Sequence, residues 1–204
     1  MAHQHCGVLL AGGRGARFGG AAKGLLAFGA GRLADGALHA LSGCCNDVVI
    51  AANDAQAESW FPGLRIARDD GPALGALGAL ATALRAGNGR SVVVCAWDMP
   101  FVTAALLEAL AQVVEEGATC CVPVHADGRA EPLCAAYGPT CSSLVIALLE
   151  RGERAGHALL QFAGGVAWPI AEAPASLVSP HTFVNVNTPD ELSQAAAWAA
   201  AVHA

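Results

Sequence analysis

Short apolar runs alternate with longer stretches of helical periodicity along residues 7–116, and glycine, proline or polar residues separate them. The apolar runs are residues 7–11, 47–52, 64–67 and 91–96. Their length and their turn-forming boundaries predict strands that are buried on both faces. The periodic stretches, which predict helices, are residues 31–43, 74–84 and about 104–116. This alternation predicts an α/β domain with a mostly parallel sheet and right-handed crossovers.

The rest of the chain is less regular. Further strands are predicted at residues 120–124, 132–137, 166–170 and 182–186, and helices at residues 144–151 and 157–162. A last helix is predicted to begin after Thr188, which fits the N-cap position, with Pro189 in the first helical position and Glu191 in the capping-box position. Thr103 is predicted to cap the helix that follows it. Because no linker or repeat interrupts the chain, we expect residues 1–204 to form a single domain.

Residues 12–24, directly after the first predicted strand, are rich in glycine and carry three cationic side chains, Arg14, Arg17 and Lys23. Lys23 is the only lysine in the chain. Backbone N–H groups of such a loop can converge on an anion, and a strand, a glycine-rich loop and a helix in this order are typical of phosphate sites. The loop lacks the G-K-[ST] ending of a P-loop and the spacing of the dinucleotide fingerprint. We therefore expect a phosphate site of another type, with a purely steric glycine-rich turn as the alternative.

Polar side chains follow the other predicted strands of the first half, since Asn53, Asp69 and Asp98 each come after one of these runs. Ligands of open parallel sheets bind outside the carboxyl ends of the strands, so we expect these side chains to meet the glycine-rich loop in one crevice. Asp98 is predicted to bind Mg²⁺ through one carboxylate, which leaves room for water and phosphate oxygens. The alternative is an aspartate that caps backbone N–H groups.

The remaining candidate site residues are amides and one further carboxylate. Asn53 and Asp69 are predicted to hold a nucleoside by hydrogen bonds, with a solvated turn as the alternative. Asn185 and Asn187 flank a valine and therefore point to the same side of an extended segment. In an otherwise apolar strand this pattern predicts a polar role at the crevice, and the alternative is an Asx turn that leads into the last helix.

The composition limits the classes of partner. The chain has 204 residues, 54% of them hydrophobic, and its net charge of −6 argues against a nucleic-acid-binding surface. No apolar run approaches the roughly 20 residues of a membrane span, and residues 1–6 lack the basic region of a signal peptide. The eight cysteines form no C-x-x-C pair, so we expect reduced, structural thiols in a cytoplasmic protein.

Five segments together resemble the signature of the MobA-like nucleotidyltransferases, in the family's order over the whole chain. They are Leu10-Ala11-Gly12-Gly13 with Arg17-Phe18-Gly19 and Lys23-Gly24-Leu25-Leu26; Asp69 with Pro72-Ala73-Leu74-Gly75-Ala76-Leu77-Gly78; Trp97-Asp98-Met99-Pro100-Phe101; Glu131-Pro132-Leu133-Cys134-Ala135; and Phe183-Val184-Asn185-Val186-Asn187-Thr188-Pro189-Asp190-Glu191-Leu192. The resemblance implies a three-layer α/β sandwich with a mostly parallel, Rossmann-like sheet and helices on both faces, of the nucleotide-diphospho-sugar transferase type. It also implies a nucleotide-binding half at about residues 1–117 and an acceptor-binding half at about residues 118–204.

The activity that the resemblance implies is the transfer of GMP from GTP to the terminal phosphate of molybdopterin, or of Mo-molybdopterin, with release of pyrophosphate. Mg²⁺ would be the cofactor, with Mn²⁺ as an alternative, and molybdoenzyme apoproteins or their chaperones would be further partners. The implied nucleotide-binding residues are Leu10, Ala11, Gly12, Gly13, Lys23, Asn53 and Asp69. The implied catalytic residues are Arg17, Lys23 and Asp98, of which Asp98 would hold the metal, and the acceptor-binding residues are Asn185 and Asn187.

Three alternatives remain open at the level of the sequence. The cytidylyltransferase branch of the family typically has L-A-A-G in the opening loop, whereas Gly12 in this chain leaves space for a purine edge, which favours guanine. Another phosphorylated acceptor, such as a sugar 1-phosphate or phospholactate, is the second alternative, and a non-catalytic nucleotide-binding module is the third. The chain departs from the family's pattern at Ala22, where many relatives have an acidic residue, and at Ala76, where proline is usual.

Overall fold

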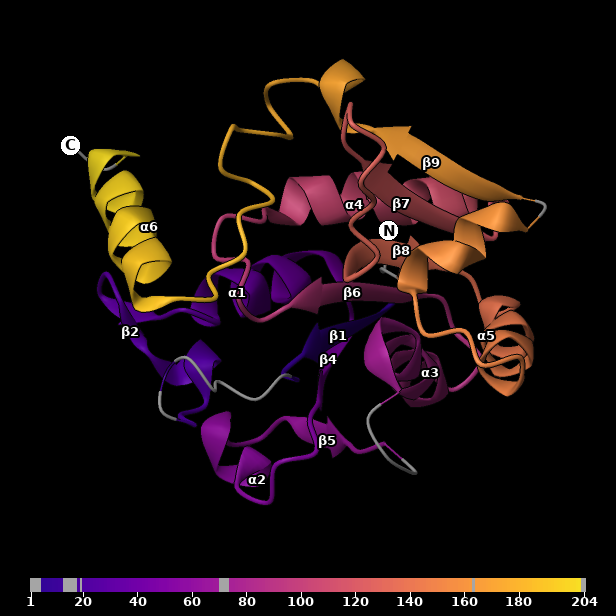
Figure 1. Ribbon diagram of the computed structural model, residues 1–204, viewed down its shortest axis with the longest axis horizontal. Coiled ribbons are helices and arrows are strands. Elements are labelled where there is room, and N and C mark those ends of the chain that lie inside the picture. Colours follow the sequence, from indigo (N-terminus) through magenta and orange to yellow (C-terminus); the bar gives the residue numbers. More distant parts are fainter. Residues whose placement is uncertain (1–4, 13–17, 19, 70–73, 163, 203–204) are drawn as a thin grey trace.

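The apolar runs of the first half form the parallel part of a central sheet (Figure 1). The computed structural model describes residues 5–12, 18, 20–69, 74–162 and 164–202. Within these ranges the main sheet has seven strands in the order β5-β4-β1-β6-β8-β7-β9. They are β1 (Cys6–Leu10), β4 (Asp47–Ala51), β5 (Arg65–Ala67), β6 (Val92–Ala96), β7 (Cys120–Val124), β8 (Cys134–Tyr137) and β9 (Gly165–Pro169). Only β8 runs against its neighbours β6 and β7, which confirms the mostly parallel sheet for the described residues.

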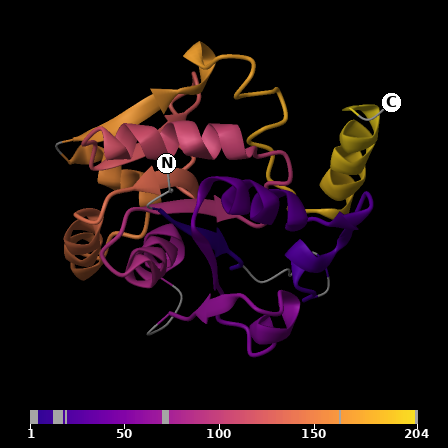
Figure 2. The same cartoon turned by 180° about the vertical axis from the view of Figure 1, so that it is seen from behind.

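Helices cover both faces of this sheet (Figures 1 and 2). One face carries α1 (Asp35–Cys44) and α4 (Ala104–Glu115), which pack against each other. The other face carries α3 (Gly75–Gly87), α5 (Cys141–Glu150) and the 3₁₀ helix η3 (Gly156–Gln161). The predicted three-layer sandwich is therefore confirmed, and the predicted cap of α4 is present, since the Leu106 N–H donates to Thr103 Oγ1 at 3.3 Å.

The strand side chains alternate between the two helical layers, which explains why the strands are apolar throughout. In β6, Val93 and Cys95 belong to the core under α1 and α4, whereas Val92 and Val94 belong to the core under α3 and α5. All four are completely buried. A central strand with helices on both faces has no solvent-facing side, so every position must be apolar.

The eight cysteines contribute to these cores as small hydrophobic residues. All of them are buried and none forms a disulfide. Burial raises the pKa of the Cys121 thiol to about 12, so at neutral pH it stays protonated and unreactive. The burial of all eight confirms the predicted structural role of the cysteines.

Two predicted elements differ from the structure. The helix expected at residues 31–43 begins only at Asp35, because residues before it form β3 (Gly31–Arg32), paired with β2 (Ala27–Phe28). The Asp35 carboxylate accepts a hydrogen bond from the Arg32 N–H at 2.7 Å, which fixes this start. The strand expected at residues 182–186 is wrong, because successive turns satisfy its backbone locally, as in the bond from the Val184 N–H to the His181 carbonyl at 3.0 Å.

The last helix, α6 (Pro189–Val202), stands at one end of the molecule beside the β2–β3 hairpin (Figure 1). Its predicted start is confirmed, since the Glu191 N–H donates to Thr188 Oγ1 at 3.2 Å. The Glu191 carboxylate accepts from the Asn187 N–H at 2.6 Å, one residue earlier than in a standard capping box. These bonds fix the segment that leads into α6. The sequence did not predict α2 (Ala57–Trp60) or the 3₁₀ helices η2 (Lys23–Leu25) and η4 (Ile170–Glu172).

Among the helices of the described residues, none combines the length and the hydropathy that a membrane-spanning helix requires.

Candidate functional site

The carboxyl ends of the parallel strands lie side by side at one edge of the sheet, because backbone hydrogen bonds between neighbouring segments continue past the strand ends. The Ala11 N–H donates to the Ala51 carbonyl at 2.9 Å, and the Trp97 N–H donates to the Leu10 carbonyl at 3.2 Å. The segments that follow β1, β4 and β6 are therefore neighbours, as the topology predicts. We call this side of the sheet the carboxyl edge.

The first group of polar side chains at this edge consists of Lys23, Asp98 and Asn187, and we call it the lysine cluster. Lys23 Nζ forms an ion pair with Asp98 Oδ2 and donates a hydrogen bond to Asn187 Oδ1 at 2.7 Å. Both charged side chains are only 11% exposed. The cluster joins η2, the loop after β6 and the segment before α6. A backbone bond from the Val186 N–H to the Asp98 carbonyl at 3.0 Å holds the last two together.

Close packing under η2 fixes the position of Lys23. Gly24 lies against the indole of Trp97, so that a Cβ at residue 24 would stand 2.2 Å from the Trp97 ring. Trp97 is buried and stacks on Trp60, with a distance of 5.2 Å between ring centroids. The turn that carries Lys23 can therefore approach the sheet only because residue 24 has no side chain.

The second group consists of Asn53, Asp69 and Thr82, and we call it the asparagine cluster. Asn53 Nδ2 donates to Asp69 Oδ2 at 2.7 Å, and Asn53 Oδ1 accepts from the Asp69 N–H at 2.8 Å. The Thr82 hydroxyl on α3 donates to Asp69 Oδ1. This cluster thus ties the loops after β4 and β5 to α3. It contains two of the predicted nucleoside-binding residues, and it lies closer to solvent than the lysine cluster.

The residues at the end of β1 and directly after it differ in their exposure. Leu10 and Ala11 are buried. They can contact a ligand only through backbone N–H or carbonyl groups that are not already bonded to a neighbouring strand. Gly12 is exposed, and a Cβ at that residue would have nothing within 4 Å. Open space therefore lies at Gly12, where the sequence predicts room for a base. The predicted site residues Gly13 and Arg17, together with Arg14, lie outside the described residues.

The two predicted acceptor-binding residues have different partners. Asn187 joins the lysine cluster, whereas Asn185 Nδ2 donates to the Phe183 carbonyl at 3.3 Å. Val186 between them is completely buried, and both asparagines are half-buried. This alternation of burial is the pattern expected for an extended segment, although the segment is not a strand.

The carboxylate of Asp98 suits a hard cation. No group of three or more His, Cys, Asp or Glu side chains in the described ranges is arranged to hold a metal ion. Mg²⁺ needs no such group in phosphoryl-transfer sites, since one carboxylate, water and substrate phosphates complete its shell. Lys23 contacts Asp98 through Oδ2, so the pair offers oxygen ligation beside a cation. The residues present therefore fit a magnesium site that is completed by substrate.

Three residues that take part in the site were not predicted. Thr82 lies in a helix that reads as purely apolar, and its offset of 13 residues from Asp69 carries no local signal. Trp97 belongs to the segment around Asp98 and carries no signal of its own, yet it packs against Gly24 in the turn that carries Lys23. Glu131, which precedes β8, is buried beside Arg129 and His125. A charged residue directly before an apolar strand was the signal that could have found it.

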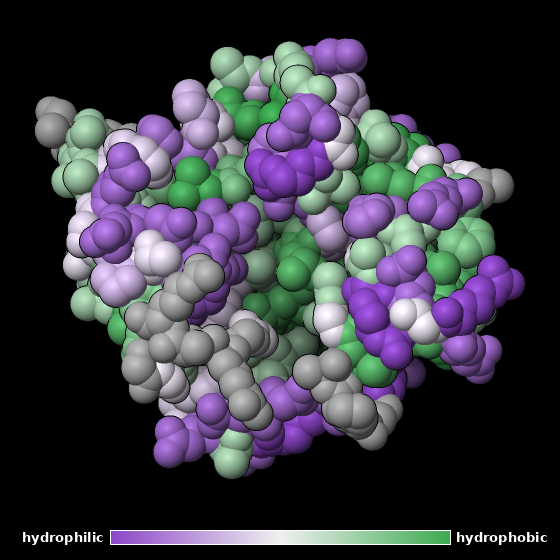
Figure 3. Space-filling view, viewed as in Figure 1, coloured by the Kyte–Doolittle hydropathy of each residue, from purple (hydrophilic) through white to green (hydrophobic). Residues whose placement is uncertain are grey.

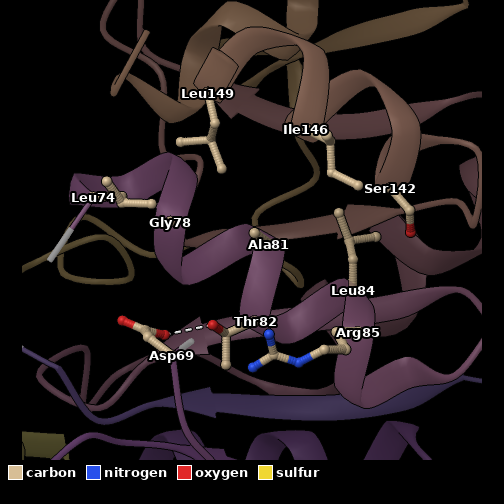
Figure 4. Close-up of a pocket in the computed structure, with 10 residues that line it drawn as sticks. All are labelled: Asp69, Leu74, Gly78, Ala81, Thr82, Leu84, Arg85, Ser142, Ile146 and Leu149. Carbon is tan, nitrogen blue, oxygen red and sulfur yellow. Dashed lines mark hydrogen bonds between the residues drawn. The ribbon is translucent and has the colours of Figure 1, made fainter. Parts of the chain in front are cut away.

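Two concave features flank these clusters. A cavity of about 550 Å³ lies between α3 and α5 (Figure 4), with Asp69, Thr82 and Arg85 at one end and, apart from Ser142, apolar residues elsewhere. Figure 3 shows a hollow in front of β1 and β6, with hydrophobic residues at its floor and hydrophilic residues above it and to its left. The cavity touches only the asparagine cluster, so the hollow is the better candidate for the predicted crevice.

Comparisons with known proteins agree with this geometry. A family model described as the MobA-like NTP transferase domain matches residues 7–172. The chain is 32% identical to a probable molybdenum cofactor guanylyltransferase of Chloroflexus aggregans, covering 94% of this chain and 93% of that protein. It is 31% identical to a molybdenum cofactor guanylyltransferase of Cereibacter sphaeroides, covering 93% of this chain and 94% of that protein.

A solved structure shares the fold over almost the whole length. The crystal structure of molybdopterin-guanine dinucleotide biosynthesis protein A from Archaeoglobus fulgidus superimposes with a TM-score of 0.81 at 27% identity, covering 96% of this chain and 99% of that chain. The 2-C-methyl-D-erythritol 4-phosphate cytidylyltransferase of Thermus thermophilus has a TM-score of 0.65 at 18% identity, which shows a common fold.

Proposed function

The chain belongs to the MobA-like NTP transferase family and is therefore a nucleotidyltransferase, and on this premise we propose that it transfers GMP from GTP to the terminal phosphate of molybdopterin. The names of the relatives support this choice of nucleotide and acceptor. The products are pyrophosphate and a molybdopterin guanine dinucleotide.

One observation carries the proposal, namely the nearly buried ion pair of Lys23 and Asp98 at the carboxyl edge, held by Asn187. Burying opposite charges costs solvation free energy, and such pairs persist where function requires charge. Here a cation and a carboxylate stand side by side. A cation can bind the phosphates of a nucleoside triphosphate, and a carboxylate can hold the Mg²⁺ that accompanies them.

The nucleoside is assigned to the asparagine cluster and to the end of β1. Asn53 and Asp69 supply hydrogen-bonding groups whose orientation is fixed by their mutual bonds. The open space at Gly12 accommodates the edge of a purine. The backbone of Leu10, Ala11 and Gly13 completes the nucleotide contacts in the proposed assignment. Residues 1–117 are thus proposed as the nucleotide-binding half.

The proposed reaction needs no protein nucleophile. An oxygen of the acceptor's terminal phosphate attacks the α-phosphorus of GTP in line. The bond from that phosphorus to the α–β bridging oxygen breaks, and pyrophosphate leaves with the electron pair. The attacking phosphate is already anionic near neutral pH, so no general base is required. The protein's contribution is to position the two substrates.

The chain's charged residues stabilise the charge that this step redistributes. Lys23 and Arg17 are proposed to bind the phosphates and to stabilise the leaving pyrophosphate. Asp98 is proposed to hold Mg²⁺, or Mn²⁺ in its place, and the ion when bound neutralises phosphate charge. Asn185 and Asn187 are proposed to bind the acceptor, which assigns residues 118–204 to the acceptor-binding half.

The test is an assay of the purified chain with molybdopterin, Mg²⁺ and either GTP or CTP, in which pyrophosphate and the dinucleotide are measured. We expect the guanine dinucleotide. Faster consumption of CTP would contradict the guanine assignment. Pyrophosphate formed only with a sugar 1-phosphate or phospholactate would contradict the acceptor. Binding of GTP without turnover of any acceptor would indicate a non-catalytic module.

Replacing the lysine tests the phosphate site separately. Lys23→Ala is expected to weaken GTP binding about 10- to 100-fold, because hydrogen bonds to charged groups are among the strongest in proteins. Arg151→Ala, which removes an exposed cation after α5, serves as the control and should bind GTP normally. Normal GTP affinity in Lys23→Ala would place the phosphate site elsewhere.

A further inference from the structure

A second charged group lies at the carboxyl edge, on the other side of β6 from the asparagine cluster. The connection between β7 and β8 forms it, since His125 follows β7 and Glu131 precedes β8. A bridge between Val124 and Ala130 closes this connection into a hairpin. The Glu131 N–H donates to the Pro123 carbonyl at 2.8 Å, which fixes the base of the hairpin. The side chains of the hairpin are therefore held on a rigid support.

Three of these side chains contact one another. Glu131 is 10% exposed at its side chain and pairs through Oε1 with the guanidinium of Arg129. Glu131 Oε1 also lies 2.9 Å from His125 Nε2, and Arg129 Nη2 lies 2.8 Å from the same nitrogen. The Arg129 side chain nevertheless remains 55% exposed. A nearly buried carboxylate thus holds a guanidinium that is still accessible from solvent.

The hairpin contacts the segment that carries the predicted acceptor-binding asparagines. The ring of His125 packs edge-on against the ring of Phe183, with 5.7 Å between centroids. The Phe183 carbonyl accepts from Asn185 Nδ2, and two residues later Asn187 bonds to Lys23. In Figure 1 the β7–β8 connection lies beside the segment that leads to α6. A chain of contacts through His125, Phe183 and Asn185 therefore connects Arg129 with the lysine cluster.

A second link runs through the sheet. The Ala96 N–H at the end of β6 donates to the Leu133 carbonyl at 2.8 Å. Leu133 is two residues after Glu131, and Ala96 is two residues before Asp98. The hairpin and the loop of Asp98 thus follow neighbouring strands and lie at the same edge of the sheet.

The charge of the chain makes an accessible cation at this place informative. The chain has a net charge of −6, and the positive charge of Lys23 at this edge is already paired with Asp98. A planar guanidinium binds such anions through paired N–H groups, provided that its orientation is fixed. Glu131 and His125 fix the orientation of the Arg129 guanidinium, while part of its N–H groups remains accessible to a ligand.

We propose that Arg129 binds the anionic acceptor of the transfer, and that Glu131 and His125 are positioning residues that hold its guanidinium at the acceptor side. This inference rests on the proposed function for the presence of a phosphorylated acceptor, but not on which acceptor it is. It adds a cation to a half for which the sequence predicts only the amides of Asn185 and Asn187.

The first test is Arg129→Gln, measured as separate KM values for the acceptor and for GTP in the pyrophosphate assay. We expect the acceptor KM to rise about 10- to 100-fold, with the GTP KM unchanged within about twofold. Arg129→Lys keeps the positive charge but loses the paired N–H groups of the guanidinium. Its acceptor KM should therefore lie between that of the wild type and that of Arg129→Gln. Arg151→Gln, an exposed arginine in the same half, makes the same change of charge and should change neither KM.

The positioning role is tested by Glu131→Gln and His125→Gln. We expect each to raise the acceptor KM by less than Arg129→Gln does, and neither to add to the effect of Arg129→Gln in a double variant. Thermal melting separates this from a structural role. If the ion pair of Arg129 and Glu131 only stabilises the fold, Arg129→Gln lowers the melting temperature and leaves both KM values unchanged. That result overturns the proposal. An equal rise in both KM values overturns it as well.

Failure of this inference and failure of the proposed function give different results. If the wild type uses molybdopterin and Arg129→Gln shows no rise in acceptor KM, the function stands and the inference is wrong. If the wild type uses another phosphorylated acceptor, the proposed acceptor is wrong. A selective rise in the KM for that other acceptor still supports the role of Arg129.

Discussion

The two polar clusters at the carboxyl edge are built in opposite ways. The lysine cluster brings together a cation and a carboxylate that are 75 residues apart and an amide 164 residues from the cation, and both charged side chains are 11% exposed. The asparagine cluster connects an amide, a carboxylate and a hydroxyl over a shorter stretch, and its bonds are partly exposed. One is a desolvated pair of charges, and the other is a frame of directional hydrogen bonds.

This difference matches what the two parts of a nucleotide require. Phosphates in a transfer reaction need charges in a medium of low polarity, where electrostatic stabilisation is strongest. A nucleoside needs hydrogen-bonding groups with a fixed direction, because recognition depends on matching donors with acceptors. We therefore expect damage to the lysine cluster to reduce turnover, in addition to the weaker GTP binding predicted for Lys23→Ala. Damage to the asparagine cluster should weaken binding of GTP and leave turnover little changed.

The largest effect is expected for Asp98→Asn. Loss of the carboxylate removes the proposed metal ligand and the partner of Lys23, so kcat should fall on the order of 10²- to 10³-fold. Chelation of divalent metal should lower the kcat of the wild type to a similar extent, and should lower the kcat of the variant little further. The measurement is pyrophosphate release at saturating substrates with varied Mg²⁺.

The matched control for this variant is Glu116→Gln, which removes one exposed negative charge after α4. It should retain normal turnover. Circular dichroism should show that Asp98→Asn stays folded, because Asn187 still accepts a bond from Lys23. Unchanged turnover in a folded Asp98→Asn protein would contradict the metal assignment.

A second effect is expected from Gly24→Ala, which tests how the lysine cluster is positioned. The added methyl group would meet the Trp97 ring at 2.2 Å, so the turn of Lys23 must shift. Overpacking of this kind costs about 1–3 kcal/mol of stability, and a displaced Lys23 should lower kcat about tenfold or more. Melting temperature and turnover are measured together.

Gly12→Ala is the companion variant, since its methyl group has nothing within 4 Å. It should leave the melting temperature unchanged and raise the KM for GTP, because the space proposed for the base is reduced. The two substitutions are chemically identical, so opposite outcomes would separate packing under the lysine cluster from contact with the nucleotide. An unchanged melting temperature in Gly24→Ala would show that Trp97 yields without cost.

The sequence predicted the residues of both clusters better than their contacts. Asp98 was found because a carboxylate follows a buried strand, and Asn187 because two amides flank a valine. Both signals are local. The ion pair of Lys23 with Asp98 spans 75 residues, and no local pattern shows it. The same holds for Gly24 against Trp97, whose contact depends on how a turn docks on the sheet.

The predicted strand at residues 182–186 shows the same limit from the other direction. Its mostly apolar sequence fits a strand, but β6 already has β1 and β8 on its two sides. The segment therefore makes a single backbone bond to the Asp98 carbonyl, through Val186, and turns elsewhere. Whether an apolar run pairs depends on a free strand edge, which only the assembled sheet reveals.

A smaller effect is expected in the asparagine cluster. Asn53→Ala removes both bonds between this residue and Asp69, so the KM for GTP should rise about tenfold while kcat changes little. Asp69→Asn should have a similar effect, because an amide nitrogen cannot accept the bond from Asn53 Nδ2, while the amide oxygen can still accept from Thr82. Steady-state kinetics with varied GTP give both values. A loss of kcat equal to that of Asp98→Asn would abolish the distinction between the two clusters.

The smallest effect is expected at the opposite edge of the sheet, where Asp47 begins β4 and accepts bonds from Arg90 at 2.6 and 3.1 Å. These bonds hold the pKa of the Asp47 carboxyl below its ordinary value of 3.8. A lowered pKa in the folded state means that the pair stabilises the fold above that ordinary value and loses this contribution as the pH falls below it. Because the Asp47 side chain is 39% exposed, we expect Asp47→Asn to cost only about 0.2–1 kcal/mol near neutral pH.

Urea unfolding of Asp47→Asn and the wild type at neutral and acidic pH checks this, and the difference should shrink in acid. Turnover and both KM values should stay normal, since this ion pair lies away from the carboxyl edge. The variant thereby separates the effect of where a paired carboxylate lies from the effect of losing its charge. Asp47 and Asp98 both pair with a cation, but only Asp98 stands where parallel strands end and a phosphate can approach. If Asp47→Asn reduced turnover as Asp98→Asn does, the loss would follow from removing any paired carboxylate, and the special role of the lysine cluster would be wrong.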